Sequence, residues 1–160
     1  RRSAGGSASF GTRMVRYPYD MASELRRAVR TMTQVGRGLE RAAAPLSIPQ
    51  YRVLTLIATA PERASRLAHR VEVTKSTLTG VIDALEAHGW IERAVVAGDR
   101  RGVSLALTEA GATVLGEAEE AMCAWLGDVL ACAGPEAVPN LSQAMAELAS
   151  ALECHRAAAT

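Results

Sequence analysis

A short run of basic and hydroxyl side chains near the middle of the chain could bind phosphates and read the polar edges of bases. It comprises Lys75, Ser76, Thr77 and Thr79. Ammonium and hydroxyl groups bind phosphate oxygens, hydroxyls also bond base edges, and threonine methyl groups can contact thymine. The alternative interpretation is that these residues are the solvated face of an amphipathic helix.

A second charged group follows in a short glycine-bounded loop, Gly98-Asp99-Arg100-Arg101-Gly102. Arginines at the tip of a hairpin are suited to phosphates or to a narrow minor groove. Asp99 would repel a phosphate unless it pairs with an arginine and orients it. The competing interpretation is a charged loop that only interacts with solvent.

The hydroxyl run lies on a predicted helix over residues 74–88. Thr74 is a suitable N-cap, and Gly89 is a suitable residue to follow the last turn. One face of this helix is apolar and consists of Leu78, Val81, Ile82 and Leu85. A short helical stretch over 64–71 and a buried helix over 47–60 precede it, so the predicted order is helix, helix, tight turn, helix.

The pattern then changes to two short segments rich in β-branched residues, 90–97 and 103–107, which predict a hairpin with the two arginines at its tip. Long helices are predicted on both sides: one over 20–45, one over 108–132 and one after Pro139. The first and last have apolar residues at a 3.5-residue spacing, which is typical of helices that pack along other helices.

Two segments of the chain contain longer diagnostic motifs. Residues 67–93 read LAHRVEVTKSTLTGVIDALEAHGWIER and end in an LE-x-x-G-W-I-E-R motif. Residues 99–111 read DRRGVSLALTEAG and contain D-x-R-x₅-L-T-x-x-G. Both resemble the helix-turn-helix and wing of the MarR family of bacterial transcriptional regulators, and the resemblance spans about residues 20–155.

The resemblance implies a mainly α fold, namely a winged helix-turn-helix with long N- and C-terminal dimerisation helices and one small β-hairpin wing. The implied organisation is a flexible basic arm (1–19), an N-terminal dimerisation helix (20–45), a DNA-binding lobe (46–111) and C-terminal dimerisation helices (112–160). A homodimer would bind a pseudo-palindromic operator in double-stranded DNA.

The resemblance also assigns roles to particular residues. Arg101 would be the wing arginine, with Asp99 holding it, while Thr108 and Gly111 would be structural. The groove-reading residues would be Lys75, Ser76, Thr77 and Thr79. Many relatives are repressors that release DNA when a small phenolic or aromatic acid binds. Candidate residues for such an effector site are Tyr17, Tyr19, Tyr51, Arg52 and Trp125, each of which has a core or surface role as its alternative.

The sequence departs from the family pattern in two ways that favour a rival hypothesis. Gly80 stands where the family often has a basic side chain. Residues 61–111 carry seven basic and seven acidic side chains, whereas residues 1–60 have a net charge of +7 and residues 112–160 a net charge of −6. The rival is a winged-helix dimer that binds a ligand or another protein and has lost DNA binding.

Other function classes lack their sequence signatures. We find no phosphate-binding glycine loop, no metal-ligand spacing and no nucleophile with an obvious partner base, so we predict neither an enzyme nor a cofactor or metal site. The three cysteines, Cys123, Cys132 and Cys154, show no CxxC spacing. No secretory signal or membrane span is visible, so a cytoplasmic location is expected.

Overall fold

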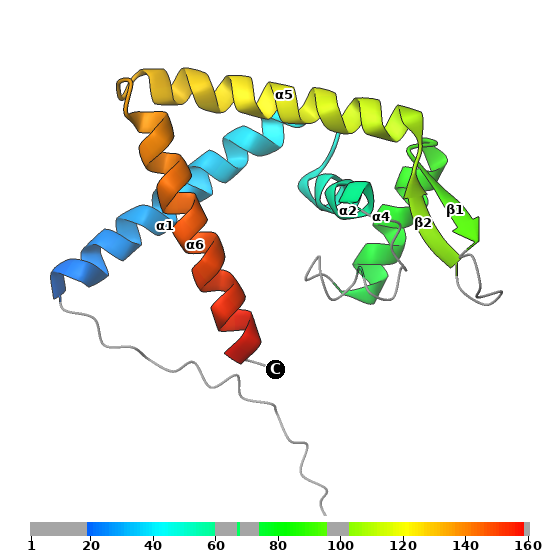
Figure 1. The fold of residues 1–160 in the computed structure, drawn as a ribbon, viewed down its shortest axis with the longest axis horizontal. Coiled ribbons are helices and arrows are strands. Elements are labelled where there is room, and N and C mark those ends of the chain that lie inside the picture. Colours follow the sequence, from blue (N-terminus) through cyan, green and yellow to red (C-terminus); the bar gives the residue numbers. More distant parts are fainter. Residues whose placement is uncertain (1–18, 60–66, 68–73, 96–102, 159–160) are drawn as a thin grey trace, which may run out of the picture. The chain divides into compact units, whose positions relative to one another are not determined.

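The computed structural model describes residues 19–59, 67, 74–95 and 103–158. The chain divides into two compact units, residues 1–35 and residues 36–160. Helix α1 (Tyr19–Ala42) begins in the first unit and ends in the second. The elements that follow are α2 (Ile48–Thr59), α4 (Lys75–Ala87), β1 (Ile91–Val95), β2 (Val103–Leu107), α5 (Glu109–Ala131) and α6 (Ala137–Ala158) (Figure 1).

The first unit is described from residue 19 and is helical throughout that part. Its large apolar side chains are exposed, although they recur at the spacing of a packed seam; they are Met21, Leu25, Val29 and Met32. A helix whose apolar residues recur in this way is usually covered by another helix.

The core of the second unit lies where α2, α4, α5 and the hairpin meet. Helix α2 contacts α4, α5 and β2, and α4 contacts β1. Val53 and Leu54 of α2 and Leu85 of α4 are fully buried. Helix α2 is therefore the central element of a small lobe, as its nearly continuous apolar sequence predicts.

The start of α2 is fixed by a reciprocal cap. The Ser47 amide donates to Oε1 of Gln50 at 2.9 Å, and the Gln50 amide donates to Oγ of Ser47 at 3.4 Å. Such a capping box satisfies backbone N–H groups that have no partner within the helix. It defines the boundary between the α1–α2 connection and the lobe.

The apolar side chains of the long helix α5 have different surroundings along its length. Val114, Leu115, Ala118 and Met122 are buried, whereas Val129, nearer the C-terminus, is exposed. Only the N-terminal part of α5 is thus fully covered by the lobe.

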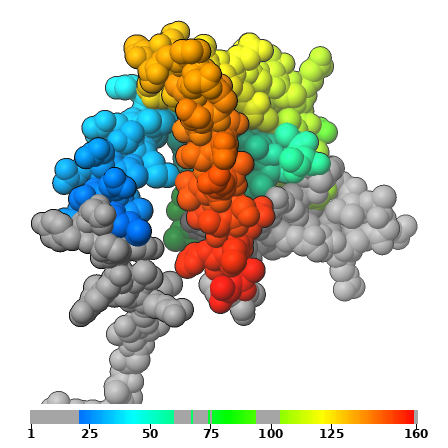
Figure 2. All heavy atoms as spheres, turned by 60° about the vertical axis from the view of Figure 1, so that its left-hand side comes forward, coloured from blue at the N-terminus to red at the C-terminus, as the bar shows by residue number. Residues whose placement is uncertain are grey.

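Helix α6 contacts α5 but has no buried residue. Its large apolar side chains at Val138, Met145, Leu148 and Leu152 are between 37% and 57% exposed. Figure 2 shows α6 as a continuous column on the surface that faces the viewer. The helix begins at Ala137, slightly earlier than predicted, because a proline is tolerated in the first turn, where Pro139 lies.

Two further predictions concern the short helix between α2 and α4 and the absence of a membrane span. The helical stretch predicted over residues 64–71 lies outside the described residues except for Leu67, which is helical and fully buried. Within the described part of the chain, no helix is long and apolar enough to cross a bilayer.

Candidate nucleic-acid interface

Helix α4 has one buried and one exposed face. Leu78, Ile82 and Leu85 are buried in the core of the lobe. The exposed residues include three predicted contact residues, Ser76, Thr77 and Thr79. Lys75 is the first residue of the helix, and its side chain lies outside the described atoms. The structure therefore presents the predicted hydroxyl groups to solvent on a helix whose other face is anchored.

Three hydroxyl groups gather at the N-terminus of α4. The Thr77 amide donates to Oγ1 of the N-cap residue Thr74 at 3.2 Å. Oγ1 of Thr74 also lies 2.8 Å from Oγ1 of Thr77 and 3.0 Å from Oγ of Ser76. Because a helix N-terminus favours negative charge and hydroxyls readily exchange partners, this cluster is suited to phosphate oxygens. Thr74 was predicted only as a cap, and its place in the cluster was not predicted.

The end of α4 is fixed by a Schellman motif. The Trp90 amide donates to the Leu85 carbonyl at 3.0 Å, and the Gly89 amide donates to the Glu86 carbonyl at 2.9 Å. Gly89 has a φ of 70°, a conformation that glycine adopts without strain. The rings of His88 and Trp90 stack with their centroids 4.3 Å apart. The chain thus turns sharply from α4 into β1.

Strands β1 and β2 pair as the predicted antiparallel hairpin, with Ile91 opposite Leu107 and Val95 opposite Val103. The first strand is described over Ile91–Val95, and residues 96 and 97 of the predicted segment 90–97 lie outside the described residues. The predicted wing-tip residues Asp99, Arg100 and Arg101 lie outside the described residues. Their assignment stays a prediction, but they belong to the segment that joins two paired strand ends.

An ion pair links α4 to the hairpin. Nε of Arg93 lies 2.6 Å from Oε1 of Glu86, and Nη2 of Arg93 donates to Oε2 of Glu86 at 3.0 Å. This two-point contact has the geometry that a guanidinium and a carboxylate favour. The hydrogen bonds from Arg93 lower the pKa of Glu86 below its ordinary value. The pair joins the exposed helix to the first strand of the wing.

The hairpin is joined to α5 by a cap that also holds the end of the α4 turn. Oγ1 of Thr108 accepts a hydrogen bond from the Gly111 amide at 3.0 Å and donates one to the Gly89 carbonyl at 2.7 Å. The Thr108 amide donates to the Trp90 carbonyl at 3.1 Å. Both residues that the resemblance identified as structural, Thr108 and Gly111, thus form this junction.

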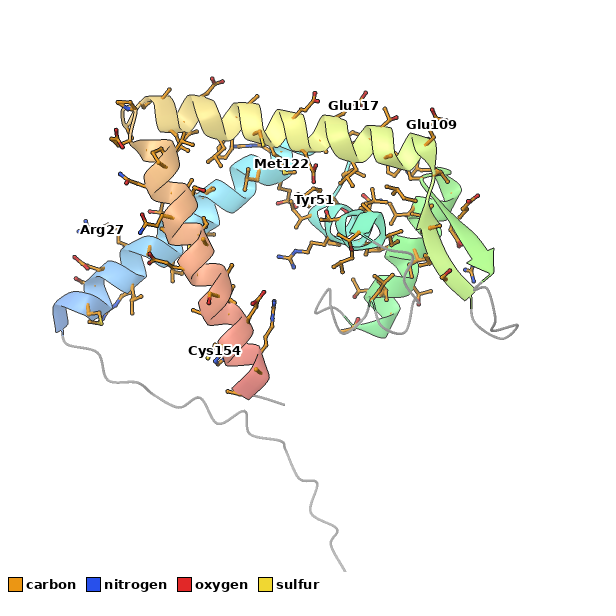
Figure 3. The ribbon with its side chains drawn as sticks, in the orientation of Figure 1. Arg27, Tyr51, Glu109, Glu117, Met122 and Cys154 are labelled. Carbon is orange, nitrogen blue, oxygen red and sulfur yellow. The ribbon has the colours of Figure 1, made fainter. Side chains whose placement is uncertain are left out.

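A separate groove of about 400 Å³ lies between the C-terminal part of α1, α2 and α5, all within the second unit. We call it the Tyr51 groove; its lining residues are Leu39, Tyr51, Glu119, Met122, Cys123 and Leu126. Figure 3 shows Met122 on the side of α5 that faces α2, with Tyr51 below it, and Glu117 on the other side of α5.

Tyr51 and Glu119 form the polar part of this groove. The Tyr51 hydroxyl donates to Oε1 of Glu119 at 3.3 Å. Burial, together with the negative charge of Glu119, raises the pKa of Tyr51 above its ordinary value. The phenol therefore remains a hydrogen-bond donor at neutral pH.

The other residues predicted for an effector site have different positions. Arg52 is exposed on α2. The indole ring of Trp125 lies against Gly38, where a Cβ atom would overlap it. Tyr17 lies outside the described residues, and Tyr19 is the first residue of α1, with a side chain that is not described. Of the five candidates, Tyr51 is the one that lines the groove.

Most of the groove was not predicted from the sequence, because its residues come from three helices. One signal was present: Glu119, Met122, Cys123 and Leu126 follow the i, i+3, i+4, i+7 spacing of one helix face.

Across the described residues, no group of His, Cys, Asp or Glu side chains could hold a metal ion.

An exposed polar helix held by a small helical lobe, followed by a two-stranded hairpin, defines the winged helix-turn-helix class. A sequence profile described as MarR family matches residues 46–103. The HTH-type transcriptional regulator YpoP of Bacillus subtilis is 31% identical over 99 residues, which cover 61% of this chain and 68% of YpoP. The chain belongs to the MarR family.

Two further comparisons agree with this assignment. The HTH-type transcriptional regulator PecS of Dickeya dadantii is 36% identical over 56 residues, and the match covers 35% of this chain and only 34% of PecS. The MarR-family regulator Sco3205 of Streptomyces coelicolor, solved in complex with DNA, superposes with a TM-score of 0.62 at 26% identity and covers 86% of this chain and 91% of that one. All these relatives are named transcriptional regulators.

Proposed function

We propose that this protein is a sequence-specific DNA-binding transcriptional regulator that binds a pseudo-palindromic operator as a homodimer. The observation that supports it most directly is the exposed hydroxyl cluster of Thr74, Ser76 and Thr77 on a helix whose other face is buried. A major groove about 12 Å wide admits one such helix, and its N-terminal residues reach the base edges. A regulator of this kind would act in the cytoplasm, where it meets its DNA.

The apolar surface of the long helices supports the homodimer. The large exposed apolar side chains of the described residues lie on α1, α5 and α6 and not on the lobe; they are Met21, Leu25, Val29, Met32, Val129, Val138, Met145, Leu148 and Leu152. Large apolar side chains that recur exposed along a helix are typical of an interaction site. A second copy would cover these faces and present two reading helices to two related half-sites.

Regulation by a small effector would use the Tyr51 groove. Its volume is within the range of ligand sites, and its lining combines apolar side chains with one phenol and one carboxylate. Because α5 begins at the hairpin junction and also lines the groove, a ligand there could shift the lobe against the long helices. Repression, relieved by such a ligand, is the form of regulation that we propose.

Selection of fragments from the encoding genome tests this function. The full-length chain should enrich one or a few intergenic sites with two-fold symmetry. On an enriched site, Lys75→Ala should weaken binding and reduce the slope of log affinity against log salt by about one, as expected for the loss of a phosphate contact. Arg156→Ala, which removes a positive charge from the last turn of α6, is the matched control and should leave both unchanged.

The rival function is a ligand- or protein-binding dimer without DNA binding. Gly80 is the observation that favours this rival. It is exposed on α4, and a Cβ atom there would meet nothing within 4 Å. If selection enriches no fragment while the chain is folded and dimeric, the DNA-binding function is wrong and the rival replaces it.

A further inference from the structure

The Tyr51 groove has a charge that suits one class of ligand. Glu119 is the one carboxylate among the described residues that line it. The remaining lining includes the apolar side chains of Leu39, Met122 and Leu126. A ligand that fills this groove thus meets an apolar wall with a single carboxylate at its edge.

The helix that provides Glu119 adds to this negative charge. Helix α5 contains five acidic residues and neither lysine nor arginine over Glu109–Ala131. One of these, Glu120, is adjacent to Glu119 in sequence and also exposed. An anionic ligand in the groove would therefore meet a like charge on Glu119 and would find no lysine or arginine on α5 to pair with.

The carboxylate of Glu119 is available for a ligand donor. It accepts one hydrogen bond, from Tyr51, at 3.3 Å. An ionised carboxylate can accept about four, so it has capacity for an ammonium group as well. The Tyr51 ring, which also lines the groove, attracts a nearby cation through its π face.

We propose that the Tyr51 groove binds an amphipathic organic cation, with its apolar body against Leu39, Met122 and Leu126 and its protonated amine on Glu119. This inference rests on the proposed role of the groove as the effector site. It differs from the aromatic acid that the family resemblance implies, because an acid would place a second negative charge beside Glu119.

A matched series of naphthalene compounds tests the charge preference. 1-Naphthylmethylamine, 1-naphthalenemethanol and 1-naphthoate share one apolar body and are a cation, a neutral molecule and an anion at pH 7. Their affinities for the full chain are measured by titration calorimetry at low salt. Glu119 is exposed and solvent screens its charge, so we expect the amine to bind about tenfold more tightly than the acid.

Two variants identify the residue responsible. Glu119→Gln should reduce the amine-to-acid ratio to within about twofold while the alcohol binds as before. Glu117→Gln is the matched control, because it removes the same charge from the opposite side of α5 (Figure 3) and should keep the preference. Both residues are exposed, so both variants should fold, which thermal unfolding checks.

Each remaining outcome overturns the proposal. Tighter binding of naphthoate than of the amine would make the groove an anion site. An unchanged amine-to-acid affinity ratio in Glu119→Gln would show that another residue causes the preference for the cation. If none of the three compounds binds at millimolar concentration, the groove is not a site for this class. DNA binding by the same preparation is measured separately, so failure of the ligand proposal is distinguished from failure of the regulator.

Discussion

The carbonyl oxygen of Trp90 lies so close to Gly111 that a Cβ atom on Gly111 would overlap it. Trp90 completes the turn that ends α4, and Gly111 lies in the first turn of α5. The same carbonyl accepts the Thr108 amide at 3.1 Å. The start of α5 is therefore packed directly on the end of the α4 turn, and this contact lies at the base of the hairpin, between the start of β1 and the end of β2.

We expect Gly111→Ala to destabilise the protein by about 1–3 kcal/mol or more, the usual range for an overpacked core, because the obstructing atom belongs to the backbone and cannot rotate away. Gly116→Ala is the control in the same helix, since a Cβ atom there meets nothing within 4 Å. It should stabilise the protein by up to about 1 kcal/mol. Denaturant unfolding measures both, and equal stability of the two variants would contradict the close contact.

The Glu86–Arg93 pair predicts a pH dependence. The pKa of Glu86 is lowered in the folded protein. The stabilisation of the fold by this ion pair is therefore fully present above the unfolded pKa of Glu86, roughly 4.3, and is lost as the pH falls through the lowered value. Because Arg93 is largely exposed, we expect Glu86→Gln to cost at most about 1 kcal/mol at pH 7. The difference from wild type in the free energy of unfolding should shrink as the pH falls and vanish at a pH low enough to protonate Glu86 in the folded protein. A difference that persists there would show that the ion pair is not its cause.

The contact between Gly38 and Trp125 predicts a difference between two neighbouring glycines. A Cβ atom on Gly38 would overlap the indole ring, so Gly38→Ala should displace the ring and cost about 1–3 kcal/mol. Gly36→Ala meets nothing within 4 Å and should be neutral or stabilising. Tryptophan fluorescence should change in the first variant and not in the second. The same spectrum in both would show that Trp125 does not pack on Gly38.

Much of this fold follows from local signals in the sequence. The cap at Thr74 and the glycine at position 89 each depend on neighbours within a few residues, and the structure confirms both. The mainly α winged fold follows from these boundaries and the apolar faces between them.

Other features of the structure could not be predicted from local patterns, because they depend on residues that are distant in the sequence. The Tyr51 groove joins residues 39, 51 and 119–126 and exists only because three helices meet. Trp125 has the amphipathic character of a ligand-binding residue, but its ring lies on Gly38, 87 positions earlier in the chain. The assignment of Lys75, Thr79 and the wing arginines to DNA stays a prediction until binding is measured.

Replacing Gly80 by a basic residue is predicted to strengthen DNA binding. It is exposed on α4, and a side chain there meets no atom within 4 Å. Gly80→Arg should strengthen DNA binding and steepen the salt slope by about one if this face lies near a phosphate. Gly80→Ala is the control; it should stabilise the helix by about 1 kcal/mol without changing the slope. An unchanged slope in Gly80→Arg would place this face away from the DNA backbone.

The affinity of the purified protein for its own upstream intergenic DNA, compared with a scrambled duplex across a salt series, tests the central claim most directly. We predict that the native sequence binds at least about 10³-fold more tightly, and that both affinities fall steeply as salt rises. Equal affinity for the native and scrambled duplexes at every salt concentration, together with no enriched fragment from the genome, would contradict a role in reading DNA sequence.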